Sequence, residues 1–156
     1  SGKKKTFERI LRPPFVAILA FDEKQRVLLT REYRHLFKKT VWRLPSGRAD
    51  HGKSIRAEAQ RELREEAGFK ARKMKLFYTS PKSQTSVWKQ CIFIATDLVS
   101  APLPKDEDEQ IKVVPMSVEK AYMLVLTGKI ENELIAFVLL KLHREWKQLK
   151  KWLKEK

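Results

Sequence analysis

Cysteine is nearly absent from this sequence, which has one, Cys91, in 156 residues. A single cysteine excludes an internal disulfide and favours a reducing compartment. Cys91 lies in the apolar run CIFIA, where a free cysteine is usually a buried strand residue. The three histidines are scattered and have no cysteine partners, so the sequence does not predict a zinc site.

Long apolar runs and low-complexity segments are also missing. No run approaches the roughly 18 residues that a membrane-spanning helix needs, and the N-terminus shows no signal-peptide pattern. No internal repeat or linker suggests a second unit. We therefore expect a cytoplasmic protein with no membrane contact and one domain over residues 3–156, with residues 1–2 as a cloning remnant.

Acidic residues are scarce relative to basic ones. The chain has 19 Asp plus Glu against 34 Lys plus Arg, a formal charge of +15. The resulting surface potential attracts anions, and it suits nucleotides, RNA and acidic lipids equally. The excess gathers in residues 3–5 and 141–156, the second of which is predicted as a basic C-terminal helix. Such runs are usually a solvated face, so nucleic acid is not the favoured partner.

Against this basic background, the stretch RELREEAGF at residues 61–69 crowds three glutamates together. At helical spacing Glu58, Glu62, Glu65 and Glu66 share one sector of a helix, where each like-charge pair costs about 0.2–0.5 kcal/mol. A sequence that accepts this cost either exposes the charge to solvent or collects it around a cation. Carboxylate oxygens are hard ligands of the kind that Mg²⁺ prefers.

Hydrophobic patterning predicts a chain of strands and helices. Residues 15–21 and 26–34 are predicted as the two strands of a hairpin, and residues 46–52 as a loop. Further strands are expected at 41–45, 73–80, 86–98 and 111–116.

Three helices are expected. Ser54 is predicted to cap a helix that runs to about Ala67, where Gly68 supplies a left-handed stop. Ser117 is predicted to cap a second helix that ends at Gly128, and the last helix is expected to begin near Glu131.

The segment from residue 47 to 69 resembles the signature of the Nudix hydrolases: Gly, five residues, Glu, seven residues, Arg-Glu, an aliphatic residue, any residue, Glu-Glu, any residue, Gly and an apolar residue. The resemblance implies a Nudix fold of the α/β (α+β) class, with a mixed β-sheet sandwiched between helices. Lys53 departs from the signature, because it stands where the family has its first glutamate. The positions that match are Gly47, Arg61, Glu62, Leu63, Glu65, Glu66, Gly68 and Phe69.

The same resemblance implies a metal site with Mg²⁺ as the cofactor and Mn²⁺ as an alternative. Glu62 and Glu66 would be the main metal ligands, helped by the carbonyl of Ser46. Glu65 would support them, and Arg61 would orient the glutamates rather than touch the substrate.

Shorter segments narrow the resemblance to the ADP-ribose pyrophosphatase branch, because EYRH, WRLPSG, YTSP, DEDEQIKVV and SVEKAYMLVLTGKI recur in that order. This branch implies hydrolysis of ADP-ribose or a related nucleoside diphosphate sugar to two monophosphates, by a homodimer. Glu107 would then be the general base and Glu109 a further metal ligand, with a solvated acidic turn as the alternative. Candidate substrate-binding residues, which are otherwise plain surface cations, are Arg31, Arg34, Arg43 and Arg48.

Lys53 raises a separate question. In the family that position pairs with the motif arginine, whereas a lysine repels Arg61. We hypothesise that Glu58 takes over part of the lost role by pairing with Lys53 or Arg61 or by joining the metal shell. The alternative is an ordinary surface glutamate.

Two other functions fit the sequence. One is a pyrophosphohydrolase acting on RNA 5′ ends or nucleoside triphosphates, which the basic ends favour. The other is a non-catalytic module that binds nucleotides or nucleic acid, supported by Lys53. Hydrolysis of a nucleoside diphosphate sugar is favoured over both, because a protein without catalysis has no use for the retained glutamates.

Overall fold

The computed structural model describes residues 5–49, 52–81, 85–104 and 110–154. Its strands are β1 (Ile10–Leu11), β2 (Phe15–Ala20), β3 (Val27–Arg34), β4 (Lys39–Arg43), β5 (Ser46–Arg48), β6 (Phe69–Thr79), β7 (Ser86–Val87), β8 (Gln90–Ser100) and β9 (Ile111–Met116). Its helices are the 3-10 helix η1 (His35–Phe37) and the α-helices α1 (Ile55–Ala67), α2 (Val118–Leu126) and α3 (Glu133–Lys154). None of the described helices is long and apolar enough to cross a membrane.

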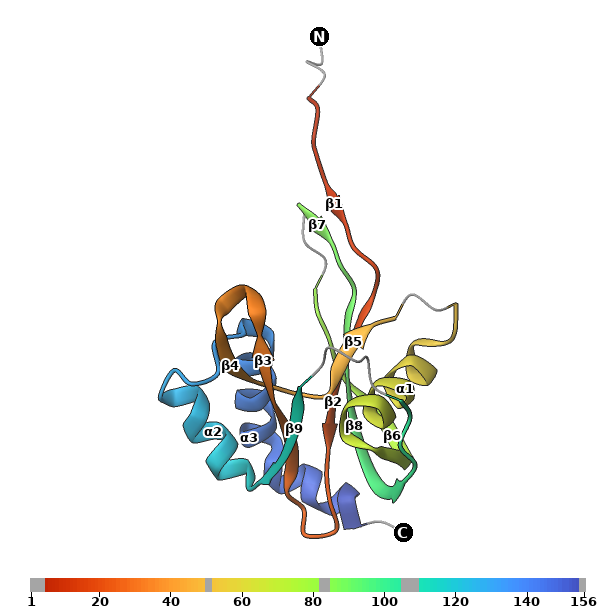
Figure 1. Ribbon diagram of the computed structural model, residues 1–156, viewed down its shortest axis with the longest axis vertical. Coiled ribbons are helices and arrows are strands. Elements are labelled where there is room, and N and C mark those ends of the chain that lie inside the picture. The colour runs from red at the N-terminus through yellow and green to blue at the C-terminus, as the bar shows by residue number, and fades with distance from the viewer. Residues whose placement is uncertain (1–4, 50–51, 82–84, 105–109, 155–156) are drawn as a thin grey trace.

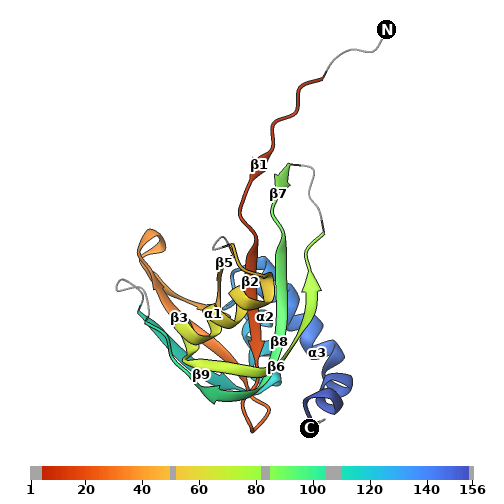
Figure 2. The ribbon, with the colours of Figure 1, turned by 90° about the vertical axis from the view of Figure 1, so that its right-hand side faces the viewer.

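The central sheet lies between helices. Its order is β5-β2-β8-β6, with β2 and β8 parallel and the other pairs antiparallel. Successive side chains of a strand point to opposite faces, so Leu19 of β2 packs in the core with α2 and α3, while Ile18 packs in the core with α1. Helix α1 thus covers one face and α3 the other (Figures 1 and 2). This arrangement confirms the predicted mixed sheet between helices.

The predicted hairpin of residues 15–21 and 26–34 is wrong. β2 pairs with β5 and β8, whereas β3 pairs with β4 and β9 in a second sheet. The isolated bridge between Phe21 and Val27 is where the two segments meet. The physical reason is burial: nearly all of β2 is buried, so it needs a partner on each edge and a helix on each face.

Residues 46–52 are not a loop throughout, because they begin with β5. This short strand pairs with β2, with Ser46 opposite Ala17 and Arg48 opposite Phe15. Polar residues and a glycine gave no sign of a strand in the sequence. The strand forms because the fully apolar β2 offers it an open edge to pair with.

The helix that carries the motif agrees with its predicted ends. The Ser54 hydroxyl accepts a hydrogen bond from the Ala57 N–H at 3.2 Å, and Gly68 ends the helix with φ at 78°. Helix α2 is likewise capped by Ser117, although it ends at Leu126 with Thr127 as its C-cap, just before the predicted Gly128. The third helix begins at Glu133, two residues after the predicted start.

The second sheet, β4-β3-β9, has one face on the side of α1. Leu28 of β3 packs in the core with α1, and Leu29 packs in the core with α2 and α3. By the same alternation Thr30, Glu32 and Arg34 lie on the side of α1. The polar end of β3 is therefore positioned to face the motif.

A ribbon made of β1 and β7 projects from the body (Figures 1 and 2). The two strands pair in parallel. The N-terminal arm leaves Phe7, Ile10 and Leu11 exposed.

Candidate functional site

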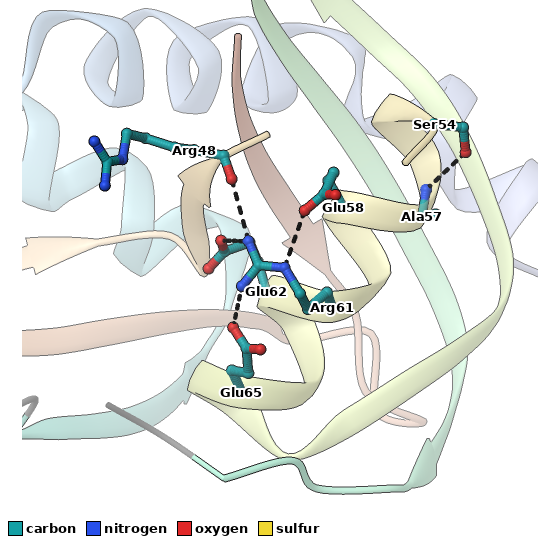
Figure 3. Close-up of polar contacts among 7 residues, drawn as sticks. All are labelled: Arg48, Ser54, Ala57, Glu58, Arg61, Glu62 and Glu65. Carbon is teal, nitrogen blue, oxygen red and sulfur yellow. Dashed lines mark hydrogen bonds and ion pairs between the residues drawn. The ribbon is translucent and has the colours of Figure 1, made fainter. Parts of the chain in front are cut away.

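Arg61 is the centre of the cluster on α1. Its Nε donates to Glu58 Oε2 at 2.9 Å, and its two terminal nitrogens pair with Glu62 and Glu65. Nη2 also donates to the Arg48 carbonyl at 3.1 Å, which links the helix to β5. Figure 3 shows the three carboxylates arranged around one guanidinium. The predicted crowding of glutamates is thus an ion-pair network rather than a solvated face.

The charged groups of this network are largely buried, so each depends on its ion-pair partners. Glu58 is 0% exposed, and Glu62 and Glu66 are buried as well. Burial lowers the pKa of Arg61, but the hydrogen bond to Glu58 and the charges of Glu62 and Glu65 outweigh it, so the pKa is raised overall. Arg61 therefore stays charged and holds the glutamates in place.

Two contacts hold α1 against β5. The Ser46 N–H donates to Glu66 Oε2 at 2.9 Å. Gly47 lies so close to Glu62 that a Cβ at this position would overlap the carboxylate. A larger residue at position 47 would displace the Glu62 carboxylate from this position, which explains in steric terms why the motif carries Gly47.

The donor set suits a divalent metal. Glu58, Glu62, Glu65 and Glu66 carry four negative charges against one positive charge on Arg61, and their oxygens are the hard ligands that Mg²⁺ or Mn²⁺ takes. In the described part of the chain, no group of three His, Cys, Asp or Glu side chains is already arranged to hold a metal ion. The residues thus fit such an ion by charge and chemistry, while Arg61 binds three of the four carboxylates.

Two of the four candidate substrate-binding arginines, Arg43 and Arg34, lie on the α1 side of the second sheet. Arg43 lies beside the motif, with Nη2 at 3.4 Å from Ser46 Oγ. Arg34 joins it through Glu32, whose Oε2 lies 2.9 Å from Arg34 Nη2 and 3.8 Å from Arg43 Nε. Together they place two cations on the α1 side of β3 and β4.

Glu32 was not anticipated from the sequence. Its carboxylate is buried between two arginines, where it fixes both. The signal that could have found it is the alternation along β3, which puts Thr30, Glu32 and Arg34 on one face.

Arg31 and Arg48 are oriented differently. The Arg31 guanidinium lies 5.2 Å from the Trp42 ring centre and lines a hollow of about 400 Å³ with Tyr33 and Lys112, on the opposite face of the sheet from Glu32. Arg48 offers its backbone carbonyl to Arg61, and its side chain extends away from Arg61 (Figure 3). Arg31 therefore lies on the other side of the sheet from the α1 glutamates.

The remaining candidates differ in where they lie. Lys53 is exposed in the turn before α1, and Gly68 ends the helix. Glu107 and Glu109 lie outside the residues that the structure describes. Glu58 is not a surface glutamate, because it is fully buried against Arg61.

Comparison with known families gives one match that covers most of the chain. A model of the NUDIX domain matches residues 11–137. This range contains the whole α1 cluster, β5 and the polar face of β3.

Two relatives and one solved structure are similar over most of the chain. ADP-ribose pyrophosphatase from Bacillus subtilis (strain 168) is 28% identical over 144 residues, which cover 89% of this chain and 77% of the relative. ADP-ribose pyrophosphatase from Mycobacterium tuberculosis (strain ATCC 25618 / H37Rv) is 31% identical over 135 residues, which cover 82% and 64%. The crystal structure of an ADP compounds hydrolase superimposes with a TM-score of 0.75 at 28% identity, over 89% of this chain and 76% of that one.

Proposed function

Because this chain belongs to the Nudix hydrolase family, we propose that it is a Mg²⁺-dependent pyrophosphohydrolase of ADP-ribose or a related nucleoside diphosphate sugar. The observation that carries the proposal is the cluster of buried glutamates held around Arg61 against β5. The substrate class is supported by the two similar ADP-ribose pyrophosphatases. Neither the glutamate cluster nor the similarity to these relatives depends on the net positive charge of the chain.

Glu62, Glu66 and the Ser46 carbonyl would hold the metal, with Mn²⁺ as the alternative ion. Glu62 and Glu66 both lie against β5, Glu66 at the Ser46 N–H and Glu62 beside Gly47. When bound, the metal would neutralise the diphosphate and make the attacking water more acidic. Arg61 keeps Glu62 and Glu65 oriented, so that little reorganisation is needed when substrate arrives.

Arg43 and Arg34 would bind the phosphates. Guanidinium groups recognise phosphate through two parallel hydrogen bonds, and Glu32 fixes both arginines on the side of α1. Arg31 is less suited to this role, because it lies over Trp42 on the opposite face of the sheet from Glu32. The Arg48 side chain points away from Arg61 (Figure 3).

The reaction adds one water to the diphosphate. The water oxygen bonds to one phosphorus, the bridging P–O bond breaks, and the products are two monophosphates: AMP and ribose 5-phosphate from ADP-ribose. Glu107 would accept the water proton and Glu109 would be a further ligand, as the sequence suggests; both lie outside the described residues.

A second candidate function, hydrolysis at RNA 5′ ends, is favoured by the basic face of α3. Lys147, Lys150, Lys151 and Lys154 are exposed there. However, α3 packs across the sheet from α1, so this face lies away from the glutamates. RNA bound there would be tethered rather than placed in the site.

The test compares substrates. Phosphate-monoester release is measured with Mg²⁺ for ADP-ribose, other nucleoside diphosphate sugars, a nucleoside triphosphate and 5′-triphosphate RNA. We expect the highest kcat/KM with a nucleoside diphosphate sugar. Preferred turnover of RNA, with a steep loss of rate as salt rises, would support the second function instead.

We also propose a cytoplasmic homodimer. The single cysteine suits a reducing compartment, and the exposed Phe7, Ile10 and Leu11 of the N-terminal arm suit an interface. Light scattering coupled to gel filtration measures the mass, and a monomer at micromolar concentration would contradict the dimer.

A further inference from the structure

We propose that Glu58 is a positioning residue, which fixes Arg61 and thereby sets where Arg61 holds Glu62 and Glu65. It is not itself a ligand of the cation. This inference rests on the proposed function, because it assigns a role within the same site.

Burial separates Glu58 from the other glutamates. The Glu58 side chain is 0% exposed, whereas those of Glu62 and Glu65 are 9% and 26% exposed. In this arrangement the Glu58 carboxylate has no surface open to an ion and its waters. Taking a charged carboxylate out of water is energetically costly, and close pairing offsets this cost. The 2.9 Å bond from Arg61 Nε supplies such a pair.

The geometry of arginine explains what the pair does. A guanidinium is planar, and its donors point in fixed directions. Glu58 holds Nε, one turn back along the helix, while the terminal nitrogens face Glu65, Glu62 and the Arg48 carbonyl. Fixing Nε therefore fixes the plane of the group and the directions in which it holds the other two carboxylates (Figure 3).

This arrangement also accounts for Lys53. The anchor of Arg61 comes from within α1, so no acid is needed at position 53 to hold it. Lys53 is exposed in the turn that precedes the helix. The departure from the signature is therefore compatible with an ordered carboxylate cluster.

Two substitutions separate positioning from metal binding. Glu58→Gln keeps an oxygen that can accept from Arg61 Nε but removes the charge. Glu58→Met keeps similar length and removes the acceptor. A positioning role needs the acceptor, whereas a metal ligand needs the charged carboxylate.

A third variant controls for general damage to α1. Gln60 lies on the same helix, and its side chain accepts from the Ala71 N–H at 3.0 Å and so ties α1 to β6. Gln60→Met removes this tie without touching Arg61. We expect it to lower the melting temperature and to leave metal affinity unchanged.

The readout is Mn²⁺ affinity, measured by electron paramagnetic resonance on the full chain without substrate, together with the melting temperature. We expect Glu58→Met to raise the Kd about tenfold and Glu58→Gln to stay within about threefold of wild type. Equal loss in the two Glu58 variants would overturn the proposal in favour of a ligand, and no loss in either would overturn it outright. A loss in Gln60→Met that matches Glu58→Met would also overturn it, because general loosening of α1 would then suffice.

Hydrolysis is not needed for this measurement. A wild-type protein that binds Mn²⁺ but cleaves no diphosphate would contradict the proposed function and leave the Glu58 test intact. A wild-type protein that binds no Mn²⁺ would contradict both.

Discussion

Gly47 on β5 and Glu62 on α1 lie so close together that the Glu62 carboxylate occupies the space of a Cβ on residue 47. β5 and α1 are therefore in direct contact at Gly47 and Glu62. The same two elements are joined by the hydrogen bond from the Ser46 N–H to Glu66. The position of both acids thus depends on how closely β5 approaches α1.

Gly47→Ala should lower kcat/KM for ADP-ribose by about 100-fold, because the new methyl group displaces the Glu62 carboxylate and a shift of about 1 Å can have this effect. Steady-state kinetics measures it. Gly128→Ala is the control: no atom lies within 4 Å of the added Cβ, but φ is 68°, so about 1 kcal/mol of stability should be lost without loss of activity. Equal activity losses in both variants would refute the steric explanation.

Arg43→Gln should raise KM for ADP-ribose about tenfold or more, because a charge-assisted bond to phosphate contributes about 1.5–3 kcal/mol. Arg31→Gln removes a cation of the same type from the opposite face of the sheet, where it lies over Trp42. It should change KM less than about threefold. If Arg31→Gln has the larger effect, the substrate occupies the hollow beside Tyr33 instead.

Lys53→Glu restores the acid of the family signature, and we expect it to change kcat/KM by less than about threefold. The reason is that Glu58 already holds Arg61. Lys53→Gln controls for the loss of the positive charge alone. A gain of more than about tenfold with glutamate, but not with glutamine, would show that position 53 limits activity.

Glu145 on α3 should contribute to the pH dependence of stability. Hydrogen bonds from Lys141 and, to a smaller degree, Arg144 lower the pKa of Glu145 below its ordinary value of 4.5, although burial opposes the shift. A carboxyl with a lowered native pKa stabilises the fold above its unfolded-state pKa, and this contribution is lost as the pH falls through the native pKa.

Urea unfolding of Glu145→Gln tests this contribution. At pH 7 the variant should be less stable than wild type by about 0.5 kcal/mol, the size of a helical ion pair. The difference should vanish at pH values well below 4.5. A difference that is the same at both pH values would show that the side chain acts through packing.

Local signals were sufficient to predict α1. Its Ser54 cap and Gly68 stop are set by neighbouring residues, so the helix ends agree with the structure. The spacing of its glutamates also predicted that they would gather on one side. The hairpin failed because strand pairing depends on which edges remain open in the folded sheet, and no short window of sequence contains that information.

Burial of charge was harder to predict. An isolated Glu58 resembles a solvent-facing helix residue, and only the contact of α1 with the sheet makes it fully buried. Glu32 was not predicted as a site residue for the same reason. It orients Arg43, which lies on the neighbouring strand and not beside it in the sequence. Pairing across elements is a property of the assembled fold.

The most direct test is hydrolysis of ADP-ribose by wild type and by Glu66→Gln, with Mg²⁺ present and then removed by a chelator. Glutamine can still accept the Ser46 N–H bond, so the variant should remain folded, which its melting temperature checks. We predict release of AMP and ribose 5-phosphate by wild type only with metal, and a rate below about 1% of wild type in the variant. Undiminished turnover in Glu66→Gln, or wild-type turnover without metal, would contradict the assignment of the α1 carboxylates as the catalytic centre.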